Sequence, residues 1–171
     1  MQKEEHQLLL YDFIFTGGEN NIYVFETDKG IVYNVKFKPT DYFFPAGSLY
    51  NKHTFEFIIE VVINPSGRNP PQDKLTPSTI SAIFEDFYRR NDRTITIYIC
   101  DSSDSRQEAR MKKFTIWYDA FNFDSRYFKI DIKLKDKVGI VYPISILLRT
   151  DNPHRLEIIE QFDKVISGYN K

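Results

Sequence analysis

The residues best suited to chemistry lie between Asp101 and Arg110, in a polar stretch that joins an expected strand to an expected helix. The stretch brings carboxylates, hydroxyls and guanidinium groups close together in the sequence. Hydroxyls, guanidinium groups and the backbone N–H groups of a helix start are common ligands of phosphate and carboxylate. The candidate binding residues are Asp101, Ser102, Ser103, Asp104, Arg106, Gln107 and Arg110.

Two interpretations of this stretch are open. A helical wheel places Arg110 in the apolar sector, so we expect it to point toward the core, where a charge needs a partner. In the structural interpretation, which we favour, Arg110 pairs with Asp101 or Asp104, and a neighbouring polar side chain caps the helix. In the alternative, Arg106 and Arg110 hold an anionic small molecule while an aspartate serves as the acid or base of an enzyme. The lack of a Gly-rich loop weakens the alternative.

A longer motif surrounds the stretch. It reads Tyr-Ile-Cys-Asp-Ser-Ser-Asp over residues 98–104 and Thr-Pro-Ser-Thr-Ile over residues 76–80, and it continues through Arg106-Gln107, Arg110, Lys113-Phe114 and Trp117. These segments resemble a family of uncharacterised bacterial proteins found mostly in Bacteroidota. The resemblance spans most of the chain and implies no activity. Ser105 departs from the glycine of the family pattern, which argues against a tight turn at that position.

A second candidate region is an apolar loop that follows a predicted strand. Loops are usually polar, so these rings either fold back as a lid over the sheet or form a contact surface for a partner. No basic residues alternate with the rings, so base stacking on nucleic acid is not favoured. The candidate partner surface consists of Tyr42, Phe43, Phe44 and Tyr50.

The remaining reactive residues are expected to be structural. No histidine lies near Cys100 in the sequence, so we expect an inert thiol. Asp131 and Lys133 have the Asp-x-Lys spacing of metal-dependent nuclease strands, which gives a third and weaker functional interpretation. They also lie on the charged face of an alternating strand, which is typical of a solvated surface. We expect no catalytic residue, no metal and no cofactor.

Hydrophobic periodicity predicts one α+β domain over residues 1–171. Alternation indicates strands at 22–27, 31–38, 54–63, 94–100, 126–134 and 140–148, and helical spacing indicates helices at 76–90, 104–121 and 152–168. Thr76 and Asn152 are the expected N-caps of the first and last helices. The order βββαβαββα predicts a mixed or antiparallel sheet of about six strands with helices packed on it. Residues 64–75, dense in turn formers, are expected to form a mobile loop.

Composition limits the classes of function. The 15 Phe and 11 Tyr among 171 residues predict an aromatic core. A net charge of -1 gives no overall attraction to nucleic acid or to an anionic membrane. The single cysteine and a start without a signal-peptide pattern favour the cytoplasm. We therefore predict a small cytoplasmic binding or protein-interaction module rather than an enzyme, with a protein or a small anion as its partner.

Overall fold

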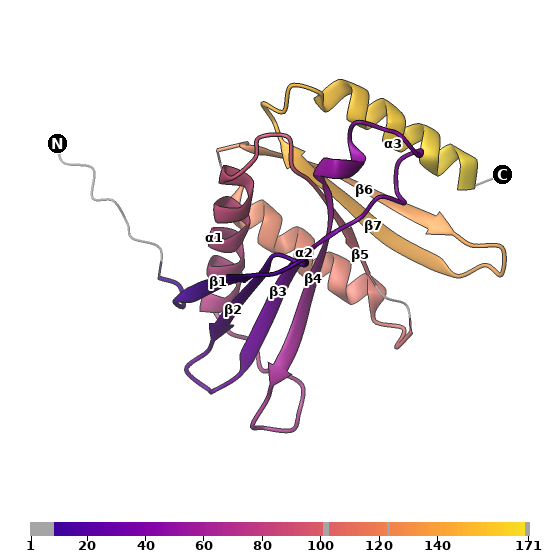
Figure 1. Ribbon diagram of the computed structural model, residues 1–171. Coiled ribbons are helices and arrows are strands. Elements are labelled where there is room, and N and C mark those ends of the chain that lie inside the picture. The colour runs from indigo at the N-terminus through magenta and orange to yellow at the C-terminus, as the bar shows by residue number, and fades with distance from the viewer. Residues whose placement is uncertain (1–8, 101–102, 123, 170–171) are drawn as a thin grey trace.

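A single mixed sheet of seven strands runs through the fold (Figure 1). The computed structural model describes residues 9–100, 103–122 and 124–169. The strands are β1 (Phe13–Gly17), β2 (Ile22–Glu26), β3 (Val32–Pro39), β4 (Thr54–Ile63), β5 (Ile95–Ile99), β6 (Tyr127–Lys135) and β7 (Val141–Arg149). The helices are α1 (Leu75–Arg89), α2 (Gln107–Phe121) and α3 (Arg155–Tyr169), and a short 3-10 turn, η1 (Asn51–His53), precedes β4. The α+β class and the mixed sheet are confirmed, with seven strands in place of the six predicted.

The additional strand is β1, which pairs antiparallel with β2 at one edge of the sheet. Its sequence, Phe-Ile-Phe-Thr-Gly, is rich in the aromatic and β-branched residues that strands favour. Gly17 and Gly18 have φ angles of 74° and 75°, in the left-handed region that glycine adopts without strain, and there the chain turns into β2. A short apolar run that ends in Gly-Gly is a hairpin signal, and the six-strand prediction missed it.

The strands lie in the order β1-β2-β3-β4-β5-β7-β6. All neighbours are antiparallel except β4 and β5, which are parallel and are connected through α1. Thr54 is opposite Ile95, and Ile95 is opposite Leu148. The starts of β4 and β5 therefore meet the end of β7 at one end of the sheet, so the loops at that end are neighbours.

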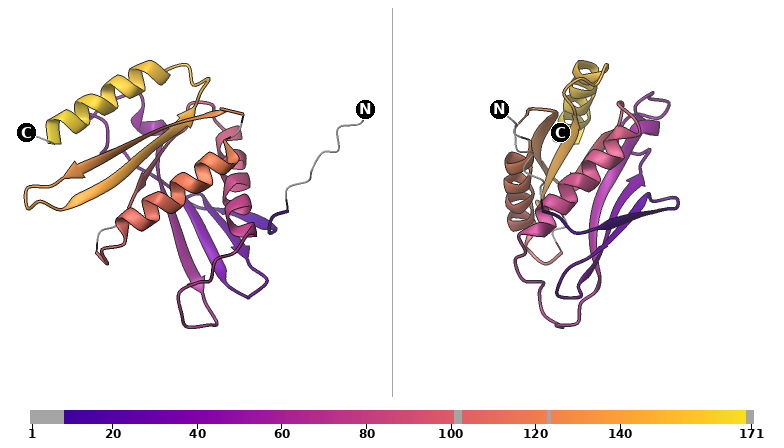
Figure 2. Two further views of the ribbon diagram at one scale, coloured as in Figure 1. Left: turned by 180° about the vertical axis from the view of Figure 1, so that it is seen from behind. Right: turned by 90° about the vertical axis from the view of Figure 1, so that its left-hand side faces the viewer.

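Two cores lie on opposite faces of the sheet. Helices α1 and α2 pack on one face, where Phe37 stacks on Phe87 with ring centroids 3.9 Å apart and meets Phe84 edge to face. On the other face, α3 and the segment 43–50 cover only the half made of β5, β7 and β6 (Figure 2). That second core joins isoleucines of β5 and β7 to Phe162 of α3. The outer face of β1–β4 is therefore covered by none of the three helices.

The helix starts differ in part from the prediction. Helix α1 begins at Leu75, and the carboxylate of Asp73 accepts the N–H groups of Leu75 and Thr76 at 2.7 and 3.3 Å. Asp73, not Thr76, is therefore the residue that caps α1. Asn152 lies ahead of α3, and its Oδ1 accepts the N–H of His154 at 2.9 Å. Residues 64–74 form turns without a helix or strand, and their mobility stays a prediction.

Candidate functional site

The predicted chemical stretch joins β5 to α2, as expected. Helix α2 begins at Gln107, three residues after its predicted start, and Arg106 occupies the N-cap position without a side-chain hydrogen bond. Asp101 and Ser102 lie outside the described residues. Ser103, Asp104 and Arg106 are exposed to solvent at the surface of the protein.

Arg110 forms a two-pronged ion pair with Asp104. The Arg110 Nη1 and Nη2 groups donate to Oδ1 and Oδ2 of Asp104 at 2.8 and 2.6 Å, and the N–H of Arg106 also donates to Oδ1. These hydrogen bonds, first of all those from Arg110, lower the pKa of the Asp104 carboxyl group. The pairing agrees with the structural interpretation of the stretch. The carboxylate is thus already neutralised by a group of the same chain.

The expectation that Arg110 points into the core is wrong. Its side chain is 38% exposed and that of Asp104 is 43% exposed, so solvent screens the pair. In α2, which the structure describes along its whole length, Phe114 is the one buried residue. Burial raises the pKa of Tyr98 and of Cys100, and Arg110 is close enough for its charge to oppose that rise in both, so its side chain lies at the edge of the core and not within it.

Two neighbours of the ion pair have unusual surroundings. Ser105 has a φ of 57°, so a serine adopts the left-handed turn for which the family pattern favours glycine. The argument against a tight turn at this position is therefore wrong. Gln107 is partly buried, and its Oε1 has no hydrogen-bond partner among the described residues.

Cys100 is a buried structural residue. It is 1% exposed, and burial raises the pKa of its thiol, which keeps the sulfur protonated and weakly nucleophilic. Asp131 and Lys133 do not form a metal site either. Asp131 pairs with Lys129 at 2.5 Å and accepts a hydrogen bond from Ser145, while Lys133 pairs with Glu108 at 3.0 Å. Among the described residues no cluster of histidine, cysteine and acidic side chains could hold a metal ion.

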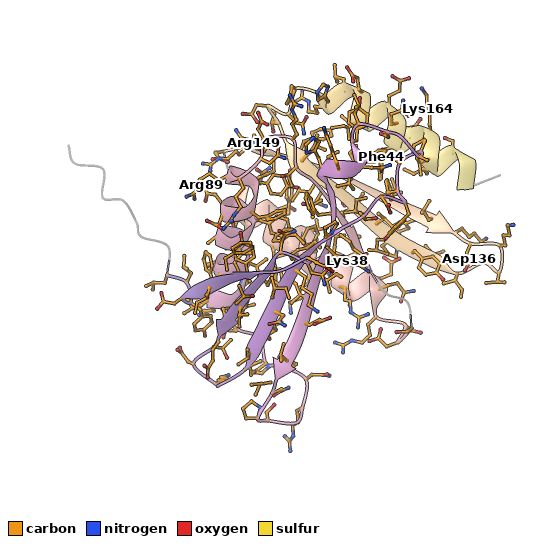
Figure 3. All side chains as sticks on the ribbon, viewed as in Figure 1. Lys38, Phe44, Arg89, Asp136, Arg149 and Lys164 are labelled. Atoms are coloured by element: carbon orange, nitrogen blue, oxygen red, sulfur yellow. The ribbon has the colours of Figure 1, made fainter. Side chains whose placement is uncertain are left out.

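The predicted aromatic surface divides into a buried and an exposed part. Phe43 and Phe44 are 8% and 2% exposed and belong to the second core, where Phe43 stacks on Phe162 of α3. Figure 3 shows Phe44 beside α3. These two rings therefore act as the lid over the sheet and do not face a partner. Tyr50 is partly buried and donates to Glu157, whereas Tyr42 is 61% exposed and donates to Glu56 at 3.3 Å.

Two hollows in the described part of the molecule lie away from the 103–110 stretch. An open one of about 620 Å³ lies between the end of β3 and the segment 46–52. A smaller one of about 60 Å³ lies between η1, the loop that follows α1 and the loop that precedes α3. Its polar lining includes His53, Arg93 and Asn152, which the sequence prediction did not select, because no local spacing connects residues so far apart.

Comparison with known proteins then places the chain. A family model matches residues 72–164, which is more than half of the chain and includes all three helices at least in part. The chain belongs to this family, DUF6169. It is described as a family of unknown function, so membership brings no activity to the residues above. No curated protein and no solved structure was found to match. In the described part of the chain, no helix is both long enough and apolar enough to span a bilayer.

Proposed function

We propose that the protein is a binding module that works as a dimer, with the outer face of β3 and β4 at the centre of the contact between two copies. The observation that carries this proposal is that the outer face presents exposed apolar side chains, and that no helix lies over these strands (Figure 1). Ile14 of β1 is 68% exposed and Val62 of β4 is 53% exposed. Half-buried Val24 and Ile58 lie on the same face, and Asn34, Lys36 and Glu60 lie between them. A surface that combines apolar and charged side chains is common in protein–protein interfaces.

The charges on this face favour a second copy as the partner. Lysines lie on β3 and glutamates on the adjacent β4, and Lys36 pairs with Glu60 at 2.5 Å within the chain. A two-fold axis parallel to the strands, between β3 and β4, exchanges these two strands between the copies and leaves β1 and β2 at the edge of the contact, on the side where α3 covers β5 and β7 of the other copy. Each lysine strand then lies over the glutamate strand of the other copy. Lys38, labelled in Figure 3, is the register partner of Glu56 and would meet that residue of the second copy.

Tyr42 extends the same surface. Its hydroxyl donates to Glu56, so the exposed ring borders the outer face of β4. Tyr42 is thus the member of the predicted aromatic surface that a partner can reach most readily. We keep it as a candidate contact residue of the dimer.

Light scattering coupled to size exclusion tests the proposal. We expect the wild type to be a dimer at micromolar concentration and Val62→Asp to be a monomer, because a carboxylate on β4 would be buried in the interface. Leu156→Asp is the matched control, since Leu156 is 73% exposed on α3, away from this face. A monomeric wild type would overturn the proposal, and so would equal dissociation of the two variants.

A charge exchange tests the two-fold arrangement itself. Lys38→Glu alone and Glu56→Lys alone should each weaken the dimer, because each places like charges opposite one another across the axis. The double variant should restore the dimer, since the pair is then reversed in both copies. A double variant weaker than either single variant would contradict the proposed axis.

We propose no enzymatic activity for the 103–110 stretch. The guanidinium of Arg110 and the carboxylate of Asp104, which such an activity would use, neutralise one another. They serve in our proposal as a clamp between the loop and α2. The buried free thiol of Cys100 is typical of a reducing compartment, which supports a cytoplasmic location, and the resemblance of the motif supports an origin in Bacteroidota.

A further inference from the structure

A small cavity lies at the end of the sheet where β4 and β5 start and β7 ends. Three segments enclose it: η1 ahead of β4, the loop 90–94 ahead of β5, and the loop 150–154 after β7. The sheet register holds these segments together, because Thr54 is opposite Ile95 and Ile95 is opposite Leu148. The cavity has a volume of about 60 Å³.

Asn152, one of the residues that line this cavity, carries an unsatisfied donor. The residue lines the cavity and is only 4% exposed. Its Oδ1 accepts the N–H of His154 at 2.9 Å. This fixes the orientation of the amide, because a flipped amide would place its NH₂ group against the N–H of His154. The Nδ2 group is buried and has no hydrogen-bond partner among the described residues. A buried donor without an acceptor is costly, so this amide requires an acceptor from outside the described chain.

His53, which lines the same cavity, carries a second donor. The Oδ1 of Asn91 accepts the N–H of Arg93 at 2.9 Å, so the Nδ2 of Asn91 is the atom 3.0 Å from Nδ1 of His53. Nδ1 must then accept this hydrogen bond, and the proton of the neutral ring lies on Nε2. Nε2 is buried and has no partner in the described structure. Two residues that line one cavity thus each carry an N–H donor without an acceptor in the described structure.

The charges around the cavity favour a negative occupant. Lys52, Arg93 and His154 line it together with the two donors. Two acidic residues lie nearby. Glu157 accepts a hydrogen bond from Tyr50 and lies 3.5 Å from Nδ1 of His154. Asp92, in the loop after α1, interacts electrostatically with His53. No carboxylate is among the lining residues, so none supplies the missing acceptor within the cavity.

We infer that this cavity binds an oxyanion, the carboxylate or phosphate group of a small molecule, between the Nδ2 of Asn152 and the Nε2 of His53. The volume equals roughly that of two water molecules, at about 30 Å³ each, which suits one acidic group but not the body of a metabolite. The rest of the ligand would extend outward past Arg93 and Lys52. The inference does not depend on the proposed dimer, because none of these residues lies on the outer face of β1–β4.

Thermal unfolding of the full chain tests the inference, with sodium phosphate and sodium acetate as probes and sodium chloride at equal ionic strength as the reference. We expect a saturable rise of the unfolding midpoint with at least one oxyanion and none with chloride. Acetate alone would identify a carboxylate site, and phosphate alone a phosphate site. The same titration followed by the ¹⁵N resonance of His53 Nε2 should give the same apparent affinity.

Two variants and a control locate the effect. Asn152→Asp keeps the Oδ1 acceptor for His154 but replaces the donor with a carboxylate, so the apparent affinity should fall by at least about tenfold. Arg93→Gln should also reduce the rise of the unfolding midpoint. This variant provides the test if Asn152→Asp does not fold. Arg68→Gln removes an exposed cation from the 64–74 segment and should bind like the wild type. Equal responses of all four proteins, or no saturable response of the wild type, would overturn the inference and leave only water as the acceptor.

Discussion

Replacing Tyr88 with phenylalanine measures how strongly α1 is tied to the centre of the sheet. The Tyr88 hydroxyl lies 2.7 Å from Oγ1 of Thr96 on β5 and 2.7 Å from the carbonyl of Leu147 on β7, and the residue is 1% exposed. A single hydroxyl proton cannot satisfy both, so Tyr88 donates to the carbonyl and accepts from Thr96. Thr96 and Leu147 are register partners, so one helical side chain bridges two paired strands.

The Tyr88→Phe variant leaves a buried hydroxyl and a buried carbonyl without this partner, and it changes the side-chain shape very little. A net hydrogen bond contributes about 1 kcal/mol and an unsatisfied buried group costs about 1–3 kcal/mol, so we expect a loss of about 2–3 kcal/mol. Urea unfolding followed by circular dichroism measures it, with an unchanged denaturant slope as the check on the comparison. Burial raises the pKa of Tyr88 far above its usual range, so the result should not depend on pH near neutrality.

Thr96→Val completes a double-mutant cycle, because valine has nearly the same shape but cannot donate. We expect the double variant to lose less stability than the two single variants together, by about 1 kcal/mol, since the two changes remove one shared hydrogen bond. Strict additivity would refute the Thr96–Tyr88 contact. A loss below about 0.5 kcal/mol for Tyr88→Phe would refute the reasoning on buried donors as well.

Three further outcomes follow from the same structure. Arg110→Ala should lower the urea midpoint only slightly, and high salt should remove the difference, because its ion pair is exposed; a salt-independent collapse of stability would contradict this. Burial lowers the pKa of His53 below its usual value of about 6.5, so its contribution to stability is complete above that pH and is lost as the pH falls toward the folded-state pKa. The stability of His53→Gln should therefore depend less on pH in this window, and parallel pH profiles would exclude the assignment. Phe43→Ala should cost about 3 kcal/mol in urea unfolding, as a core residue, whereas Tyr42→Ala should stay within about 0.5 kcal/mol; equal effects would contradict the division of the loop into buried and exposed rings.

The elements whose signal is local were predicted well. Strand β4 spans Thr54–Ile63 as predicted, and β6 and β7 are each displaced by one residue. In β6 the alternating Phe128 to Leu134 face the second core, because a strand has the same period of two wherever it lies in the sheet. The alternating pattern was therefore sufficient where the face on which a side chain lies depends only on its position along the strand.

Features that depend on distant residues were not predictable in the same way. The cap of α1 is Asp73, which also accepts the hydroxyl of Tyr11, a residue from ahead of β1. In α3, Leu156 is 73% exposed whereas Ile158, two residues further on, is 1% exposed, although both are apolar. Arg110 likewise lies at the edge of the core, with its side chain 38% exposed, and not within it. A wheel gives angles around a helix axis, and only the tertiary packing decides where the neighbouring layer ends.

The cavity at the end of the sheet bears on how the family region is organised. The region that matches the family, residues 72–164, supplies Arg93, Asn152 and His154, whereas Lys52 and His53 come from ahead of it. The two contributions meet because β4 is the parallel neighbour of β5. Without β4, β5 would lose one ladder of hydrogen bonds, and the cavity would lose the wall that carries the Nε2 donor. If this cavity binds an oxyanion, the β1–β4 half is therefore an integral part of the binding unit and not an appendage to the matched region.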